Sequence, residues 1–310
     1  MFPETKNIPL QKIEAAFLKE KKINLYVLRL DLIHPYISGN KWYKLKYNLE
    51  EAKRQGKNIL VTFGGAYSNH IVATATAGKE FGFKTIGIIR GEELEASPPA
   101  PLRGRGEQRA RNSVLKFSED CGMVLQFISR EEYRKKDASL SFSMTDECYV
   151  LPEGGTNELA VKGCSEIISL IDIPFDYVCC AVGTGGTVAG IISSLRAEQK
   201  AIGFPVLKGG EFLKNEIEKL LHHFQIDSFS NFQINTDYHF GGYAKKNEEL
   251  LNFISDFKSK HDIQLDFVYT GKMMFGIFDL VNKNYFREGA TIVAIHTGGC
   301  PPFLEDRVQG

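Results

Sequence analysis

Residues 177–199, YVCCAVGTGGTVAGIISSLRAEQ, contain the pattern that decides the fold. An apolar run at Tyr177–Ala181 leads into a loop of glycines and threonines, which is followed by an amphipathic stretch at Thr187–Gln199. This order predicts a buried strand, a tight loop and a helix, which together form one unit of a parallel α/β sheet. Successive backbone N–H groups in such a loop can bind a phosphate group. The loop has neither the Lys-Ser/Thr pair of a Walker A motif nor the spacing of a dinucleotide fingerprint, so it fits a small phosphate-bearing cofactor better than a nucleotide.

The same alternation of short apolar runs and amphipathic stretches continues along the chain and is typical of βαβ units. The runs expected to form strands are Asn24–Leu28, Asn58–Phe63, Thr85–Ile89, Met123–Phe127, Tyr177–Ala181 and Thr291–Ile295. The stretches expected to form helices are Leu45–Gln55, Asn69–Phe81, Ala160–Ile171, Thr187–Gln199, Asn247–Lys260 and Met274–Lys283. The junctions after Phe63, Ala181 and Ile295 are rich in glycine, serine and threonine, and they lie at carboxyl ends of strands, where open α/β sheets place ligands.

Length and composition limit the classes of protein. A chain of 310 residues suggests two domains, and 38 basic against 38 acidic residues give no overall charge to attract nucleic acid or an anionic membrane. No apolar stretch reaches transmembrane length and the N-terminus lacks a signal-peptide core, so we expect a cytoplasmic protein. The six cysteines form no CxxC pair and are expected to be reduced, with no metal site. The polar, arginine-rich stretch Ala96–Asn112 is expected to be a surface loop.

Two motifs near the N-terminus hold polar side chains at expected helix starts. In Ser38-Gly39-Asn40-Lys41 a lysine follows a Gly-Asn turn, and Lys44 lies one helical turn further on. An imine with an aldehyde cofactor needs an unprotonated amine, which nearby positive charge or burial favours. In residues 64–70, GGAYSNH, paired glycines allow close approach of a ligand, and the helix start favours an anionic group such as a carboxylate. A simple N-cap role for Ser68 or Asn69 is the alternative.

Together with Pro152–Asn157 (PEGGTN), the loop Gly183–Thr187, Tyr269–Lys272 (YTGK) and His296–Gly299 (HTGG), these motifs resemble one family. They are similar to those of the 1-aminocyclopropane-1-carboxylate (ACC) deaminase and D-cysteine desulfhydrase family of fold-type-II pyridoxal 5′-phosphate (PLP) enzymes. The resemblance runs from about Leu25 to about Phe303 and is interrupted only by the arginine-rich stretch. Its specific part is the order of the six motifs.

The resemblance implies roles for individual residues. Lys41 would bind PLP as a Schiff base, and Lys41, Ser68 and Tyr269 would be catalytic. The cofactor-binding residues that it implies are Lys41, Lys44, Asn69, Gly183, Thr184, Gly185, Gly186, Thr187 and Thr270. The substrate-binding residues that it implies are Ser68, Asn69, His70, Tyr243, Tyr269 and Thr297.

Two positions distinguish the branches of this family. The ACC deaminases have a glutamate, which meets the pyridine nitrogen, where this chain has Thr270, and a leucine where it has Thr297; both threonines match the D-cysteine desulfhydrase pattern. A neutral hydroxyl leaves the ring a weaker electron sink, which suffices when loss of the α-proton is followed by departure of a thiolate. We therefore expect α,β-elimination on a D-amino acid, with D-cysteine giving pyruvate, ammonia and hydrogen sulfide.

There are three alternatives to this function, and the third, a nicotinamide oxidoreductase, is the weakest. ACC ring opening to 2-oxobutyrate is the second enzymatic hypothesis, and a PLP-binding protein without turnover is the non-enzymatic one. A nicotinamide oxidoreductase would leave Lys41 and Tyr269 without a role.

The resemblance also implies the architecture. We expect the tryptophan-synthase-β-like fold, with two open, twisted α/β domains and the cofactor in the cleft between them. Residues 1–43 and 149–310 would form the larger, PLP-binding domain, and residues 44–148 a smaller inserted one. The expected assembly is a homodimer, and the expected partner is a small amino-acid substrate rather than nucleic acid or a membrane.

Overall fold

The structure, a computed structural model, describes residues 7–91, 112–135, 146–224 and 231–299. The expected surface loop, apart from Asn112, and Cys300 lie outside these ranges. The described residues divide into two compact units. We call the described residues of Phe2–Tyr47 and Thr156–Glu305 the main unit, and those of Asn48–Gly155 the inserted unit. The two units meet at Tyr47/Asn48 and Gly155/Thr156, whereas the resemblance implied boundaries at 43/44 and 148/149.

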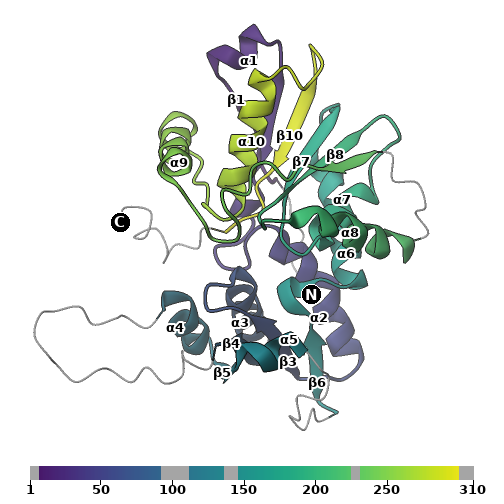
Figure 1. Cartoon of the computed structure of the whole chain (residues 1–310). Helices are drawn as coiled ribbons and strands as arrows, with labels where there is room; N and C mark the ends of the chain where they lie inside the picture. The colour runs from purple at the N-terminus through teal and green to yellow at the C-terminus, as the bar shows by residue number, and fades with distance from the viewer. Residues whose placement is uncertain (1–6, 92–111, 136–145, 225–230, 300–310) are drawn as a thin grey trace, which may run out of the picture. The chain divides into compact units, whose positions relative to one another are not determined.

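The main unit is built on a six-stranded sheet with the order β1-β2-β10-β7-β8-β9 (Figure 1). Strand β1 is antiparallel to β2, and the other four neighbouring pairs of the sheet are parallel. Strand β10, late in the chain, lies between β2 and β7, and Ile292 is opposite Leu25 on one side and Tyr177 on the other. The strands are β1 (Leu10–Ile13), β2 (Asn24–Leu28), β7 (Tyr177–Val182), β8 (Lys200–Pro205), β9 (Phe232–Ile234) and β10 (Thr291–Ile295).

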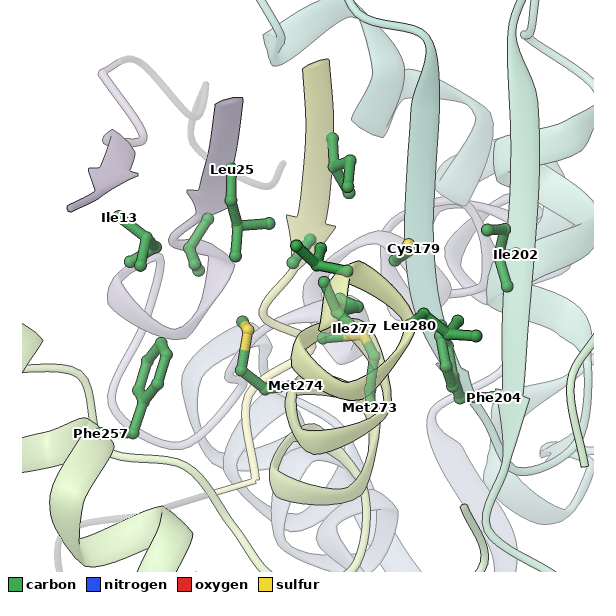
Figure 2. Packing of buried hydrophobic residues seen from close by; sticks show 14 of the residues in the cluster. Ile13, Leu25, Cys179, Ile202, Phe204, Phe257, Met273, Met274, Ile277 and Leu280 are labelled. Atoms are coloured by element: carbon green, nitrogen blue, oxygen red, sulfur yellow. The ribbon is translucent and has the colours of Figure 1, made fainter. Parts of the chain in front are cut away.

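One face of this sheet packs against helix α10 (Thr270–Asn282) and helix α9 (Glu248–His261). Alternate strand residues and one helical stripe meet there because strands repeat every two residues and helices every 3.6. Figure 2 shows this core. The labelled residues are Ile13, Leu25, Cys179, Ile202, Phe204, Phe257, Met273, Met274, Ile277 and Leu280. The intervening Val178 and Cys180 face the opposite side of the sheet.

The remaining helices of the main unit are α1 (Ala16–Glu20), α6 (Glu158–Ser165), α7 (Gly186–Ile192) and α8 (Leu213–His222). Helix α7 ends well before Gln199, where the sequence had placed its end. Two serine hydroxyls stop it, because Ser193 Oγ donates to the carbonyl of Gly190 at 2.7 Å and Ser194 Oγ donates to that of Ser165 at 2.8 Å. The expected helix at Ala160–Ile171 likewise changes to a 3₁₀ turn after Ser165.

Two helices begin earlier than their apolar pattern indicated. Helix α2 (Asn40–Arg54) starts five residues before Leu45, so Lys41 lies in its first turn rather than before the helix. Gly39 makes this start possible because its φ of +62° is in the left-handed region, where glycine is favoured. Helix α10 starts at Thr270 rather than at Met274, because the carboxylate of Asp266 accepts hydrogen bonds from the backbone N–H groups at its N-terminus.

The inserted unit has a four-stranded parallel sheet with the order β5-β4-β3-β6. Its strands are β3 (Ile59–Gly64), β4 (Lys84–Arg90), β5 (Met123–Ile128) and β6 (Cys148–Leu151), and its helices are α3 (Asn69–Phe81), α4 (Ser113–Asp120) and α5 (Arg130–Lys135). Figure 1 labels these elements in the inserted unit. Helices α3 and α4 pack on the sheet through a small core that includes Ile71, Leu115 and Met123.

The two sheets with their helices make this an α/β protein, as the sequence predicted. In the part of the chain that the structure describes, no helix combines the length and the apolar character that a membrane span requires.

Candidate active site

Lys41 is the first residue of the site because its amine has an unusual environment. Burial of the ammonium among protein atoms, followed by repulsion from Lys44, holds the pKa of Lys41 well below its ordinary value, although part of the side chain is accessible. A depressed pKa leaves more of the amine unprotonated, which is the form that attacks an aldehyde. The side chain therefore has the property that the sequence motif predicted for it.

Lys44 lies one turn further along α2 and is only 2% exposed. Its Nζ donates to Thr156 Oγ1 at 2.9 Å and approaches Thr184 Oγ1 at 3.4 Å, and these two hydroxyls are 2.5 Å apart. The positive charge therefore lies directly behind the glycine-threonine loop that follows β7. Burial lowers the pKa of Lys44 as well.

The loop Gly183–Thr187 is tightly packed and joined to the start of α2. Gly185 has a φ of +86°, and a Cβ on Gly186 would lie 2.8 Å from the Thr156 side chain. Asn40 Nδ2 donates to Thr187 Oγ1 at 2.8 Å, which fixes the loop to the turn that carries Lys41. Thr184 is exposed, whereas Gly185, Gly186 and Thr187 are buried. Because α7 has only seven residues, amides and hydroxyls of the loop and the charge of Lys44 are the groups suited to an anion, more than a helix dipole.

Two tyrosines adjoin this loop. A Cβ on Gly183 would lie 3.2 Å from Cε1 of Tyr269, so the absence of a side chain on Gly183 lets the tyrosine ring come close. Tyr243, which is 43% exposed, packs edge-on against Tyr269 with the ring centroids 6.2 Å apart. The structure thus brings Lys41, Lys44, the loop and both tyrosines into one region of the main unit.

Thr270 does not present its hydroxyl at this region. The residue is 0% exposed, and its Oγ1 donates to Asp266 Oδ2 at 2.7 Å while accepting from the backbone N–H of Asp266 at 2.9 Å. A group that touches a cofactor should have some accessible surface when the cofactor is absent. The geometry therefore gives no support to the expected contact between Thr270 and the pyridine ring, and the reason is its capping bond to Asp266.

Thr297, at the carboxyl end of β10, retains 9% exposure. Its carbonyl accepts from the backbone N–H of Asn40 at 3.3 Å, and a Cβ on Gly39 would lie 2.0 Å from that oxygen. Only glycine at position 39 allows this contact, so the end of β10 and the turn before Lys41 are held together. Of the two branch-marking threonines, Thr297 is the one with accessible surface.

In the inserted unit, Ser68 and Asn69 lie at the start of α3, and both are partly exposed. Ser68 Oγ accepts from the backbone N–H of His70 at 3.3 Å, so the N-cap interpretation of Ser68 holds whether or not it has another role. His70 is 1% exposed and is packed against Gly155, with its Nε2 2.8 Å from Thr62 Oγ1. Thr62 donates to the carbonyl of Leu151, so it accepts from His70. This environment suits a structural histidine better than one that contacts substrate.

Four residues of the region were not singled out by sequence reasoning. They are Asn40, Thr156, Asp266 and Lys272. Asn40 and Thr156 belong to motifs that were recognised, but only the fold shows that they bond to Thr187 and Lys44. Asp266 could have been found from the sequence, because an aspartate shortly before a helix often accepts hydrogen bonds from the backbone N–H groups of its first turn. Lys272 ends the recognised YTGK motif, but nothing in the sequence indicates its burial, because a lysine in an apolar helix usually points to solvent.

The residues of the main unit fit a phosphate-bearing aldehyde. A buried ammonium, three threonine hydroxyls and a close-packed glycine loop can bind a phosphate, and beside them Lys41 has an amine of lowered pKa that can react with an aldehyde. Among the described residues, no cluster of three or more His, Cys, Asp or Glu side chains is arranged to hold a metal ion.

Comparisons with known proteins agree with this chemistry. Residues 1–298 match the family described as "Pyridoxal-phosphate dependent enzyme". A Pyrococcus furiosus protein, provisionally named 1-aminocyclopropane-1-carboxylate deaminase, is 33% identical over 296 residues, which cover 89% of this chain and 84% of that protein. The Arabidopsis thaliana mitochondrial bifunctional D-cysteine desulfhydrase/1-aminocyclopropane-1-carboxylate deaminase is 30% identical over 299 residues, with 89% of this chain and 72% of that protein covered.

The solved structure of an ACC deaminase homologue superposes with a TM-score of 0.79 and 27% identity, covering 97% of this chain and 93% of the other. Family match, fold and site chemistry therefore lead to one conclusion: the chain belongs to the pyridoxal-phosphate dependent enzymes of the tryptophan-synthase-β-like fold, and its cofactor is pyridoxal 5′-phosphate.

Proposed function

We propose that this enzyme catalyses α,β-elimination on a D-amino acid, with D-cysteine and water giving pyruvate, ammonia and hydrogen sulfide. The observation that carries the proposal is that both branch-marking positions hold neutral hydroxyl residues, Thr270 and Thr297. ACC deaminases have glutamate at the first position and leucine at the second, so at both positions this chain matches the D-cysteine desulfhydrase pattern. The bifunctional plant relative, named for both activities, supports the inclusion of D-cysteine among the candidates.

PLP, when bound, supplies an electron sink for the bonds at the substrate α-carbon. In the proposal Lys41 holds the cofactor, while the loop Gly183–Thr187 and the charge of Lys44 bind its phosphate. Tyr269, with Tyr243 against it, would line the place of the substrate and orient its leaving group. For Ser68 and Asn69 we propose the roles that the family resemblance gives them: Ser68 is a catalytic residue near the substrate α-carbon, and Asn69 contacts the cofactor ring.

Ring opening of ACC to 2-oxobutyrate and ammonia is the second candidate. Its specific support is the Pyrococcus furiosus relative at 33% identity, whose provisional name gives that activity alone. The enclosed position of Thr270 also weakens the argument from that residue, since a threonine that does not contact the cofactor does not tune its ring. The choice of branch then depends more heavily on Thr297.

The experiment is a substrate comparison with a cofactor control. Purified protein should be yellow, and Lys41→Ala should lose the absorbance band of the lysine-bound cofactor. With D-cysteine the wild type should release pyruvate and sulfide, and with ACC it should form little 2-oxobutyrate. Efficient turnover of ACC without any turnover of D-cysteine would refute the proposed substrate and favour the second candidate. A yellow protein inactive on both would favour the non-enzymatic hypothesis.

A homodimer in the cytoplasm completes the proposal. Light scattering after size exclusion should give about twice the 34.8 kDa mass of the chain. A monomer of full activity would contradict this part alone.

A further inference from the structure

Lys272 is a charged side chain in an unusual place. It lies in the first turn of α10, is 1% exposed, and ranks with Tyr43 and Phe204 among the largest fully buried side chains. Burial lowers the pKa of Lys272 to about 8, with Asp266 acting in the opposite direction. A lysine is seldom buried unless its ammonium group has a specific task.

The Nζ of Lys272 donates to two backbone carbonyls, that of His239 at 2.8 Å and that of Gly242 at 2.7 Å. Both acceptors belong to residues 239–245, which we call the Tyr243 loop, between strand β9 and helix α9. Four of its residues have left-handed backbone conformations: Phe240, Gly241, Gly242 and Ala244, with φ of 53°, 90°, 120° and 54°. For Phe240 and Ala244 this conformation is unfavourable, so the loop needs contacts that hold it in place.

The loop carries Tyr243 to the ring of Tyr269, and Lys272 lies three residues after Tyr269 in the chain, in the first turn of α10. The same short segment therefore supplies one tyrosine and the ammonium that fixes the backbone beside the other. Gly242, whose carbonyl Lys272 binds, is the direct neighbour of Tyr243 in sequence. A shift of that carbonyl would move the Tyr243 side chain relative to Tyr269.

We propose that Lys272 is a positioning residue that holds the Tyr243 loop against α10 and thereby sets the distance between Tyr243 and Tyr269 at the substrate site. It acts through the two carbonyls and does not touch substrate. The inference rests on the proposed function insofar as the two tyrosines are taken to line the substrate site. It extends that function by assigning the shape of the pocket, and hence discrimination between substrates, to a residue buried behind it.

The test compares the cofactor-loaded wild type with Lys272→Met, which keeps the length of the chain but removes the ammonium. Lys283→Met is the matched control, because Lys283 follows the same helix, is exposed and pairs with Asp279 at the surface. Two readouts are taken: amide hydrogen exchange of residues 238–246, and KM and kcat for D-cysteine. The exchange readout needs no turnover, so it still tests the positioning role if D-cysteine is not the substrate; ACC then replaces it as the kinetic probe.

In Lys272→Met the amides of the Tyr243 loop should exchange about tenfold faster, while those of the second half of α10 stay as in the wild type. KM should rise about tenfold with kcat changed less than about threefold, because binding geometry is altered but the reacting groups remain. In a Tyr243→Ala background the same substitution should no longer change KM. Lys283→Met should match the wild type in both readouts.

Unchanged exchange in the loop, or an undiminished effect on KM in the Tyr243→Ala background, would overturn the proposal. Where Lys272→Met does not fold, Gly242→Ala takes its place. A Cβ there has ordinary contacts with Lys208 at 3.5 Å, but the φ of 120° is strained for alanine, so the variant loosens the same loop while the lysine remains. It should raise KM and loop exchange in the same way, and wild-type values for both would reject the inference.

Discussion

Replacement of Lys44 by methionine separates cofactor binding from folding. The Nζ of Lys44 is 2.9 Å from Thr156 Oγ1 and 3.4 Å from Thr184 Oγ1, so an anion bonded to these hydroxyls is roughly 6 Å from the charge. Two unit charges at that distance attract by about 3 kcal/mol at an effective dielectric constant of about 20. Part of this attraction offsets the cost of displacing water, and a net loss of about 1.5–3 kcal/mol corresponds to PLP affinity about 10- to 100-fold weaker.

The protein without cofactor should respond differently. Burial lowers the pKa of Lys44, which means that its charged form costs stability in the folded protein at neutral pH. The Thr156 and Thr184 hydroxyls remain bonded to each other at 2.5 Å when the ammonium is gone. We therefore expect the melting temperature of cofactor-free Lys44→Met to equal or exceed that of the wild type.

The assay is titration of the cofactor-free protein with PLP, followed by absorbance, beside thermal unfolding of the same samples. Lys46→Met is the control, since Lys46 lies on the same helix but pairs with Glu166 in a partly exposed position. Its PLP affinity should be that of the wild type. Affinity of Lys44→Met within about threefold of the wild type would refute the assignment of Lys44 to the phosphate site.

Three further predictions concern single residues. Ser68→Ala should lose about 1 kcal/mol of stability because it removes the N-cap, whereas Ser68→Gly should lose only a few tenths of a kcal/mol. If Ser68 is catalytic, both variants should lose most of the turnover while they retain PLP. A fully active Ser68→Gly would show that the residue is only an N-cap. Thr270→Glu should destabilise the protein by about 3 kcal/mol or more rather than change its substrate, because it places a second carboxylate beside Asp266 in a fully buried position. An unchanged melting temperature would contradict the buried position of Thr270. The pKa of Lys272 is lowered to about 8, so above that pH the unfolded chain binds a proton that the folded protein does not. The free energy of unfolding of the wild type, relative to that of Lys272→Met, should therefore rise by about 1 kcal/mol between pH 8 and 9. Denaturant titrations that show a constant difference between the two proteins would contradict this.

The periodic elements of the fold were readable because their signals are local. Strands β2 and β10 and helix α3 begin and end at the residues that the sequence indicated. Strand β8 was not predicted. The preceding helix was predicted to run to Gln199 but ends at Ile192, where two serine hydroxyls bond back to the chain. Bonds of this kind depend on which carbonyl is within reach, and composition does not record that.

The site was predictable to the extent that its motifs are contiguous. Lys41 and the loop Gly183–Thr187 stand out in the sequence, and the fold brings them together through Asn40. The burial of Thr270 and Lys272 could not be read, because both depend on which side of α10 faces the sheet and on a capping carboxylate at Asp266. Position within a motif is therefore a weaker sign that a residue contacts the cofactor than accessible side-chain surface at the site.

The contact between Gly39 and Thr297 has a consequence for the order of events during synthesis. Strand β10 lies in the middle of its sheet, between strands that leave the ribosome much earlier, and the carbonyl of Thr297 closes on the turn before Lys41. A growing chain that has not yet reached residue 297 lacks both the central strand and the wall of that turn. Such long-range closure is slow compared with local helix formation. The turn that carries Lys41 is thus completed only after residue 297 has been made, so we expect a growing chain to bind PLP only after that point.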